Sequence, residues 1–161
     1  MIRRPIVPLL SGAAAAVLAG CTATPPARLD SFNLGSNAAG ERCAAARNWS
    51  DAATPDPFSR AYAITCSSVA ASRPLGTVRI VPAEPAPIAA VDAQFDCGDR
   101  RDLTIGGVPA TAARCFDRQT GLESIRLDLT RGQRRYVAAG TPAILPQVEE
   151  ALTVAAGLRR P

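Results

Sequence analysis

The sequence predicts an α+β fold: a mainly antiparallel sheet in two disulfide-containing halves, with a C-terminal helix packed on it. Three observations favour this fold. Several short segments alternate apolar and polar residues, which is typical of half-buried strands. Four cysteines fall into two groups of two, one group in each half of the chain. Near the C-terminus the apolar residues instead recur every three or four positions, as on one face of a helix.

The first half is expected to contribute two strands. Residues 60–66 and residues 77–81 alternate between apolar and small or polar side chains, which predicts half-buried strands. Residues 43–49 are ambiguous, because their consecutive alanines favour a helix but the run is short. The proline- and alanine-rich residues 82–90 fit a semi-extended connector between the halves and a surface loop equally well.

The second half is expected to contribute four strands. The clearest alternation places Ile125, Leu127 and Leu129 inward, with Arg126 and Asp128 outward in the solvent. Glycine-containing turns separate the segments. The four predicted strands are 102–105, 111–116, 122–130 and 134–138.

Arginine stands at the centre of one predicted strand in each half, as Arg79 and as Arg126. In both halves this strand follows two cysteines and a turn. An internal duplication and chance both explain so short a pattern. The paired arginines at 100–101, 134–135 and 159–160 are expected on the solvated surface.

The last element is predicted to be a helix. Pro146 suits its first turn, where no backbone donor is needed. Gly157 suits the position just after its end. An apolar stripe is expected to lie on the sheet. The stripe consists of Leu145, Val148, Leu152 and Ala155.

Four cysteines remain if Cys21 is set aside, an even number that suits disulfides in an oxidising compartment. Three pairings are possible. The partners nearest in sequence, Cys43 with Cys66 and Cys97 with Cys115, are favoured because each pair lies within one half. Each disulfide would stabilise its half by about 3 kcal/mol in the chain-entropy model. A four-thiolate zinc site is the alternative, but the closely spaced cysteine pair usual in such sites is absent from the sequence.

The N-terminus has the pattern of a signal peptide. Arg3 and Arg4 precede an apolar stretch at 6–19, whose helical length of about 21 Å is short of the roughly 30 Å hydrocarbon layer. Leu18-Ala19-Gly20-Cys21 resembles the lipobox of bacterial lipoproteins. The resemblance implies a diacylglyceryl group on the Cys21 thiol, cleavage before that residue, and attachment to a membrane. An ordinary signal peptide with an incidental cysteine is the alternative.

Three regions are therefore expected: a lipoprotein signal peptide at 1–20, a lipidated N-terminus and flexible tether at 21–40, and a single small α+β domain at 41–161. Two acyl chains anchor a protein stably. Thr22 is not aspartate, and by resemblance to the sorting rule of Gram-negative lipoproteins this implies the outer membrane. The domain is expected to face the periplasm.

A second resemblance is carried by residues 43–81 and extends over residues 30–158. Arg47-Asn48-Trp49-Ser50-Asp51, followed by Ala61-Tyr62-Ala63-Ile64-Thr65-Cys66, resembles the N-terminal region of secreted proteins that carry tetratricopeptide repeats and a caspase-like CHAT domain. Neither the repeats nor that domain is found in this sequence, so no catalytic residue is carried over. The resemblance implies a non-catalytic sensing or docking module.

The composition excludes several chemistries. The sequence contains neither histidine nor lysine, so Ser-His-Asp triads, histidine metal ligands and Schiff-base chemistry are ruled out. Carboxylate chemistry remains. Asp96, Asp99 and Asp102 could surround a cation, but interleaved arginines favour a solvated turn. We therefore assign no catalytic residue, no metal ligand and no cofactor.

All 18 basic residues are arginine against 14 acidic residues. A GC-rich genome explains this usage, and guanidinium recognition of phosphate or carboxylate is the functional alternative. Without Arg3 and Arg4 of the expected signal peptide, 16 basic and 14 acidic residues remain, and this net charge of +2 is too balanced for a nucleic-acid binder. The sequence thus predicts a lipid-anchored, non-catalytic binding or scaffolding module of the bacterial envelope, whose partner is an envelope protein or cell-wall component. A small envelope hydrolase with a carboxylate pair and a passive structural lipoprotein are the alternatives.

Overall fold

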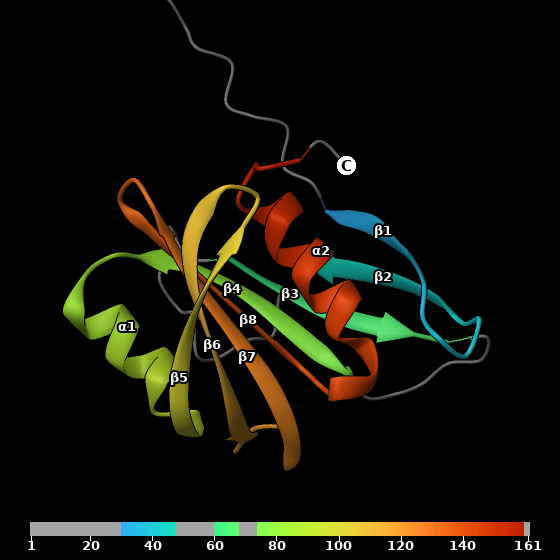
Figure 1. Cartoon of the computed structure of the whole chain (residues 1–161), viewed down its shortest axis with the longest axis horizontal. Coiled ribbons are helices and arrows are strands. Elements are labelled where there is room, and N and C mark those ends of the chain that lie inside the picture. Colours follow the sequence, from blue (N-terminus) through green and yellow to red (C-terminus); the bar gives the residue numbers. More distant parts are fainter. Residues whose placement is uncertain (1–29, 48–59, 68–73, 160–161) are drawn as a thin grey trace, which may run out of the picture.

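The computed structural model describes residues 30–47, 60–67 and 74–159, which form one eight-stranded antiparallel sheet with two α-helices (Figure 1). This architecture confirms the predicted fold class. The strand order is β1-β2-β3-β4-β8-β7-β6-β5. The elements are β1 (Ser31–Ser36), β2 (Arg42–Arg47), β3 (Arg60–Cys66), β4 (Gly76–Pro82), α1 (Pro85–Asp92), β5 (Phe95–Ile105), β6 (Val108–Asp117), β7 (Leu122–Arg131), β8 (Arg134–Gly140), the 3-10 helix η1 (Pro142–Ile144) and α2 (Leu145–Ala155).

The chain builds the sheet from two four-stranded meanders. Strands β1 to β4 run from one edge to the centre, and β5 to β8 run from the other edge to the centre, so that β4 and β8 are neighbours. Helix α1 connects the centre of the sheet to its far edge. Strand β8 lies between β4 and β7, and these two strands are therefore parallel to each other on either side of it.

The two helices cover opposite faces of the sheet. Val148 and Leu152 of α2 are fully buried in a large core, as the predicted stripe requires. Val91 of α1 is buried in a second, smaller core, together with Val81 and Val137 of the central strands. Consecutive residues of β4 and β8 therefore alternate between two buried faces. This explains why six consecutive residues of β4 are buried.

Helix α1 corrects the expectation for residues 82–90. This segment is neither an extended connector nor a loop, because a helix begins at Pro85. Pro85 and Pro87 both lie in the first turn, where a missing backbone donor costs nothing. Only Val91 is buried in this helix. The segment consequently shows no amphipathic stripe that would have revealed a helix in the sequence.

Strand β1 corrects part of the expected tether. Phe32 and Leu34 are buried against the α2 core, so residues 31–36 belong to the sheet rather than to a flexible segment. Strand β2 covers residues 43–47 of the ambiguous segment 43–49 and ends at Arg47. Residues 37–40 form the turn that joins β1 to β2. The predictions for the signal peptide, for Cys21 and for tether residues 22–29 lie outside the described residues.

The other strands and the C-terminal helix agree with the predictions. The expected strand at 102–105 is longer, because β5 begins at Phe95 and passes through an irregularity between Cys97 and Arg100. Gly157 follows α2 with a positive φ of 66°, the conformation usual after a helix end. Among the described residues, neither α1 nor α2 has the length and hydropathy of a membrane-spanning helix.

Both predicted disulfides are formed, Cys43 with Cys66 and Cys97 with Cys115. Each joins directly opposite residues of neighbouring strands, β2 with β3 and β5 with β6. The first contacts the α2 core, and the second borders the α1 core. Persistent disulfides indicate an oxidising, extracytoplasmic environment.

Candidate functional site

An open groove lies on the α2 side of the sheet, over β5, β6 and β7 and next to η1. Ile125 places it on this side, because it alternates with the core residues Leu127 and Leu129. The groove consists of two adjoining hollows of about 600 and 470 Å³, within the usual range for ligand sites. Both hollows are lined by Gly98, Arg114, Ile125 and Pro142.

The register of the three strands arranges the groove in three cross-strand rows. The acidic row contains Asp96 of β5, Phe116 of β6 and Glu123 of β7. The middle row contains Arg114 opposite Ile125, with Gly98 nearby in the irregular part of β5. The end row contains Arg101 opposite Ala112, followed by Leu127 on β7.

The groove is shaped by two small residues of the sheet and by the apolar residues that begin η1 and α2. Gly98 has no side chain, and Ala112 contributes only a methyl group between the arginines. Pro142 of η1 and Leu145 of α2 form the apolar wall on the other side. Helix α2 thus covers the central strands and leaves the outer three partly open.

The acidic row suits a cationic group. Phe116 is 48% exposed, which is unusual for a large apolar side chain, and the carboxylates of Asp96 and Glu123 lie on either side of it in the row. An aromatic ring attracts a cation over its face, and flanking carboxylates add to this attraction. The row therefore offers a site for an ammonium or guanidinium group.

The other two rows suit an anionic group. Arg101 and Arg114 are exposed, and neither forms an ion pair or a side-chain hydrogen bond with another residue of the described segments. They occupy diagonal positions on adjacent strands, where Cβ atoms lie roughly 7–8 Å apart. Two guanidinium groups at this spacing can bind one carboxylate or phosphate through paired hydrogen bonds.

A buried arginine pair occupies the opposite face of the sheet, under α1. Arg79 of β4 and Arg126 of β7 are each only 1% exposed. They lie opposite Val137 and Ala139 of β8. Both guanidinium groups contact the ring of Phe95, at 5.8 and 4.9 Å from its centre. The prediction that Arg126 faces solvent is wrong, because α1 and the start of β5 cover this second face.

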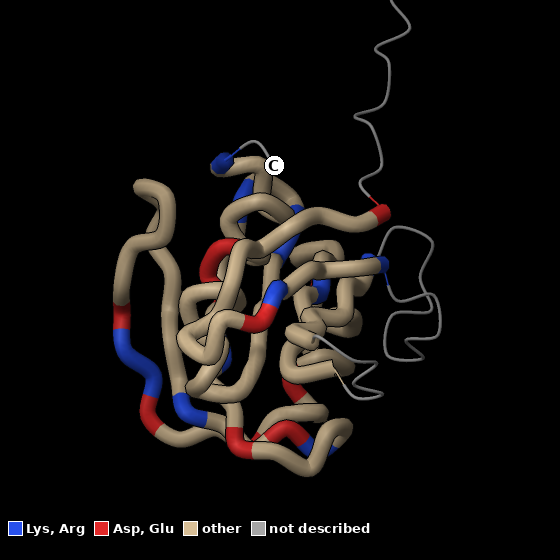
Figure 2. Tube along the Cα trace, turned by 90° about the vertical axis from the view of Figure 1, so that its right-hand side faces the viewer, with Lys and Arg blue, Asp and Glu red and all other residues tan. Residues whose placement is uncertain are grey.

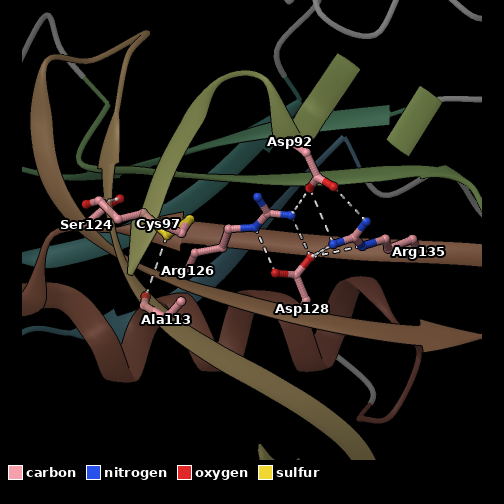
Figure 3. Close-up of a disulfide and its surroundings, with 8 residues drawn as sticks. Asp92, Cys97, Ala113, Ser124, Arg126, Asp128 and Arg135 are labelled. Carbon is pink, nitrogen blue, oxygen red and sulfur yellow. Dashed lines mark hydrogen bonds and ion pairs between the residues drawn. A yellow bond between two sulfur atoms is a disulfide. The ribbon is translucent and has the colours of Figure 1, made fainter. Parts of the chain in front are cut away.

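Arg126 belongs to a closed network of two arginines and two aspartates (Figure 3). Its Nε donates to Asp128 at 2.7 Å and its second guanidinium nitrogen donates to Asp92, the last residue of α1. Arg135 pairs with Asp128 at 2.8 Å and with Asp92 at 3.4 Å. Asp128, also expected in solvent, is buried. We call these four residues the clasp, since they fasten the end of α1 to β7 and β8.

The electrostatics of the clasp follow from burial and pairing. Burial opposes ionisation of Asp92, but the hydrogen bond from Arg126, its charge and the charges of Arg135 and Arg100 outweigh it, so the pKa of Asp92 is lowered. Burial also disfavours the charged form of Arg126, yet the hydrogen bonds and charges of Asp128 and Asp92 raise its pKa. Every member of the clasp has an oppositely charged partner within it, which gives the clasp a structural role.

The remaining buried arginine is also held by protein groups. Arg79 donates to the hydroxyl of Thr77 at 3.2 Å and to the side-chain carbonyl of Gln119. The expectation that both residues 134 and 135 are solvated is wrong for Arg135, whose side chain is only 13% exposed.

The structure separates the three aspartates singled out in the sequence. Asp96 and Asp99 line the groove, whereas Asp102 lies opposite Thr111 and does not. In the described part of the chain, no three histidine, cysteine or acidic side chains are grouped so that they could hold a metal ion. Ser124 donates to the backbone carbonyl of Cys115 at 3.4 Å.

Sequence reasoning did not identify the groove. Its rows combine residues from three strands with η1, and only the register brings Phe116 between two carboxylates. Alternation alone could have placed Arg114 and Phe116 on the same face of β6. Comparison of the chain with protein-family models, with curated proteins and with solved structures found no match.

Proposed function

We propose that this chain is a lipid-anchored, non-catalytic module of the bacterial envelope that binds another envelope component in its groove. The observation that carries the proposal is the pair of arginines, Arg101 and Arg114, which have no ion-pair or hydrogen-bond partner among the described residues and line the same groove as the exposed ring of Phe116. Unpaired charges next to apolar surface are typical of recognition sites. Acidic and basic residues are otherwise interspersed along the trace (Figure 2), as expected for a domain that does not bind nucleic acid.

The anchor is a separate part of the proposal. The lipobox-like residues ending at Cys21 support lipidation there, with residues 1–20 as a signal peptide and the outer membrane as the destination. The disulfides support export. We expect Cys21→Ala to leave an uncleaved precursor that takes up no labelled palmitate. Normal labelling of this variant would contradict the anchor.

The binding role can be tested by blocking the groove. There is room for a side chain at position 98, because a Cβ atom placed on Gly98 would meet only the carbonyl oxygen of Arg114, at 3.9 Å. Gly98→Leu should therefore fill the groove and leave the fold intact. Ala90→Leu adds the same side chain at an exposed position of α1, on the other face, and is the matched control.

Crosslinking in intact cells followed by purification of the chain provides the measurement. We expect adducts with the wild-type chain and with Ala90→Leu, and their loss with Gly98→Leu. Adducts that persist in Gly98→Leu would show that the groove is not the binding site. The absence of any adduct with the wild-type chain would favour a passive structural lipoprotein.

A hydrolase with a carboxylate pair is the second candidate. Asp96 and Glu123 line the same hollow from strands that are second neighbours, roughly 10 Å apart. This separation is close to the wide spacing of inverting glycosidases. Both side chains lie at exposed positions, however, whereas the catalytic acid of such an enzyme is usually held in a sheltered, apolar pocket. We expect no turnover of cell-wall fragments at any pH, and an acidic bell-shaped profile lost in Asp96→Asn would favour the hydrolase.

A further inference from the structure

We infer that the groove binds a short peptide with a free amino group and a free carboxylate, which lies along β6 with its amine at the acidic row and its carboxylate between the two arginines. The inference rests on the proposed binding function and names the chemistry of its ligand. It follows from the opposite charges at the two ends of the groove and from their spacing.

The spacing defines the length of the ligand. Phe116, Arg114 and Ala112 follow each other at every second position of β6, so successive rows are about 6.8 Å apart. A carboxylate held between Arg114 and Arg101 would therefore lie about 10 Å from the ring of Phe116. Three residues in an extended conformation span about the same distance.

The acidic row at one end of the groove argues against simpler anionic ligands. A fatty acid or a free phosphate would pair with Arg101 and Arg114 but leave Asp96, Glu123 and the exposed ring of Phe116 without a partner. A second negative charge near the acidic row would be repelled. A ligand with an ammonium group would form ion pairs with the two carboxylates of this row and a cation–π contact with the ring of Phe116.

The middle of the groove suits the body of such a peptide. Ile125, Pro142 and Leu145 offer apolar contacts, and Gly98 leaves space for the backbone. Addition of a peptide as a new strand at the edge of β5 is disfavoured, because its irregular register and its interleaved charges oppose edge pairing. The peptide is therefore expected over the face of the sheet.

Trialanine is the probe that tests this assignment, since it has both charged ends and small side chains. Saturation-transfer NMR with the protein purified from membranes in detergent would measure the binding of trialanine, of its N-acetylated form and of its C-amidated form. We expect the free peptide to bind. Each capped form should bind about tenfold more weakly, because each cap removes one hydrogen-bonded contact to a charged group. Equal affinity of the free and capped forms would overturn the inference.

Variants assign each end of the peptide. Arg101→Gln with Arg114→Gln should weaken trialanine about tenfold and remove the preference for the free carboxylate. Phe116→Leu should reduce the preference for the free amine. Arg118→Gln changes an exposed arginine outside the groove and should leave binding unchanged. If the variant with both arginines replaced still binds free trialanine more tightly than C-amidated trialanine, the proposed orientation is contradicted.

The outcome also separates this inference from the proposed function. Cellular adducts that Gly98→Leu abolishes, together with no saturation transfer from trialanine, would overturn the peptide assignment and leave the binding role standing. If neither adducts nor trialanine binding is found, both fail. Trialanine binding that Gly98→Leu abolishes supports both.

Discussion

At the scale of single residues, the clasp contains charged residues that the alternating sequence pattern predicts to be exposed but that the structure buries. Arg126 and Asp128 alternate with aliphatic neighbours, and in a sheet with one covered face they would lie in water. The structure covers both faces, and the two charges survive burial because each is paired. The sequence could not predict this pairing, since Asp92 reaches the clasp from a helix that its own composition does not reveal.

The clasp predicts how stability depends on pH. The pKa of Asp92 is lowered below its ordinary value of 3.8, so its ionised form stabilises the fold fully above that pH. This contribution is lost as the pH falls through the lowered pKa. We expect Asp92→Asn to be less stable than the wild type near neutrality and to approach it below pH 3.8. Urea unfolding from pH 2.5 to 7 measures the difference, and an unchanged difference at low pH would contradict the role of Asp92.

Removal of the buried cation should have a larger effect. Arg126→Ala leaves Asp128 buried with one partner fewer and removes the contact with Phe95. We expect the free energy of unfolding to fall by about 3 kcal/mol. Arg118→Ala, at an exposed turn, should stay within about 0.5 kcal/mol of the wild type. Denaturant unfolding of the two variants compares them, and similar small losses would show that the clasp is dispensable.

At the scale of elements, predictability followed the strength of the local pattern. Strands β3, β4 and β7 were predicted because their alternation is regular, and α2 because its apolar stripe is continuous. Helix α1 was missed because it buries one residue and begins with prolines. Strand β1 was missed because its glycine and polar residues resemble a linker, although Phe32 and Leu34 are buried.

The contact of α2 with the sheet depends on two glycines. Gly140 of β8 lies opposite Gly76 of β4, and a Cβ atom on Gly140 would come within 2.5 Å of the Val148 side chain. That β-branched side chain has one strongly preferred rotamer in a helix. Gly140→Ala should therefore push α2 outward and cost about 1–3 kcal/mol of stability.

Thermal unfolding checks this expectation. Gly107→Ala is a useful comparison, because a Cβ atom there meets nothing within 4 Å although its φ is positive at 82°, so it reports backbone strain alone. A Gly140→Ala variant at least as stable as the wild type would show that the helix does not need this close approach.

At the scale of the whole molecule, the anchor and the groove are supported by different observations. The N-terminal anchor is inferred from the sequence alone. The groove is visible only in the structure, because it needs the register of three strands, the small residues Gly98 and Ala112, and the end of α2 in one place. The disulfide pairs were predicted because each joins cysteines that are nearest in sequence.

The disulfides give a prediction for the exported protein. Mass mapping under non-reducing conditions should find Cys43 joined to Cys66 and Cys97 joined to Cys115. These bonds close loops with separations of 23 and 18 residues, and each is expected to stabilise the domain by about 3 kcal/mol. Four free thiols in protein recovered from the envelope would contradict an oxidising location.

The most direct test of the binding role places a photoreactive amino acid at Phe116, inside the groove, and at Ala90, on the opposite helix. Both positions are exposed, so irradiation of intact cells compares two accessible sites on one protein. We expect a discrete adduct from position 116 and none from position 90. No adduct at position 116, or equal labelling from both positions, would contradict the binding role.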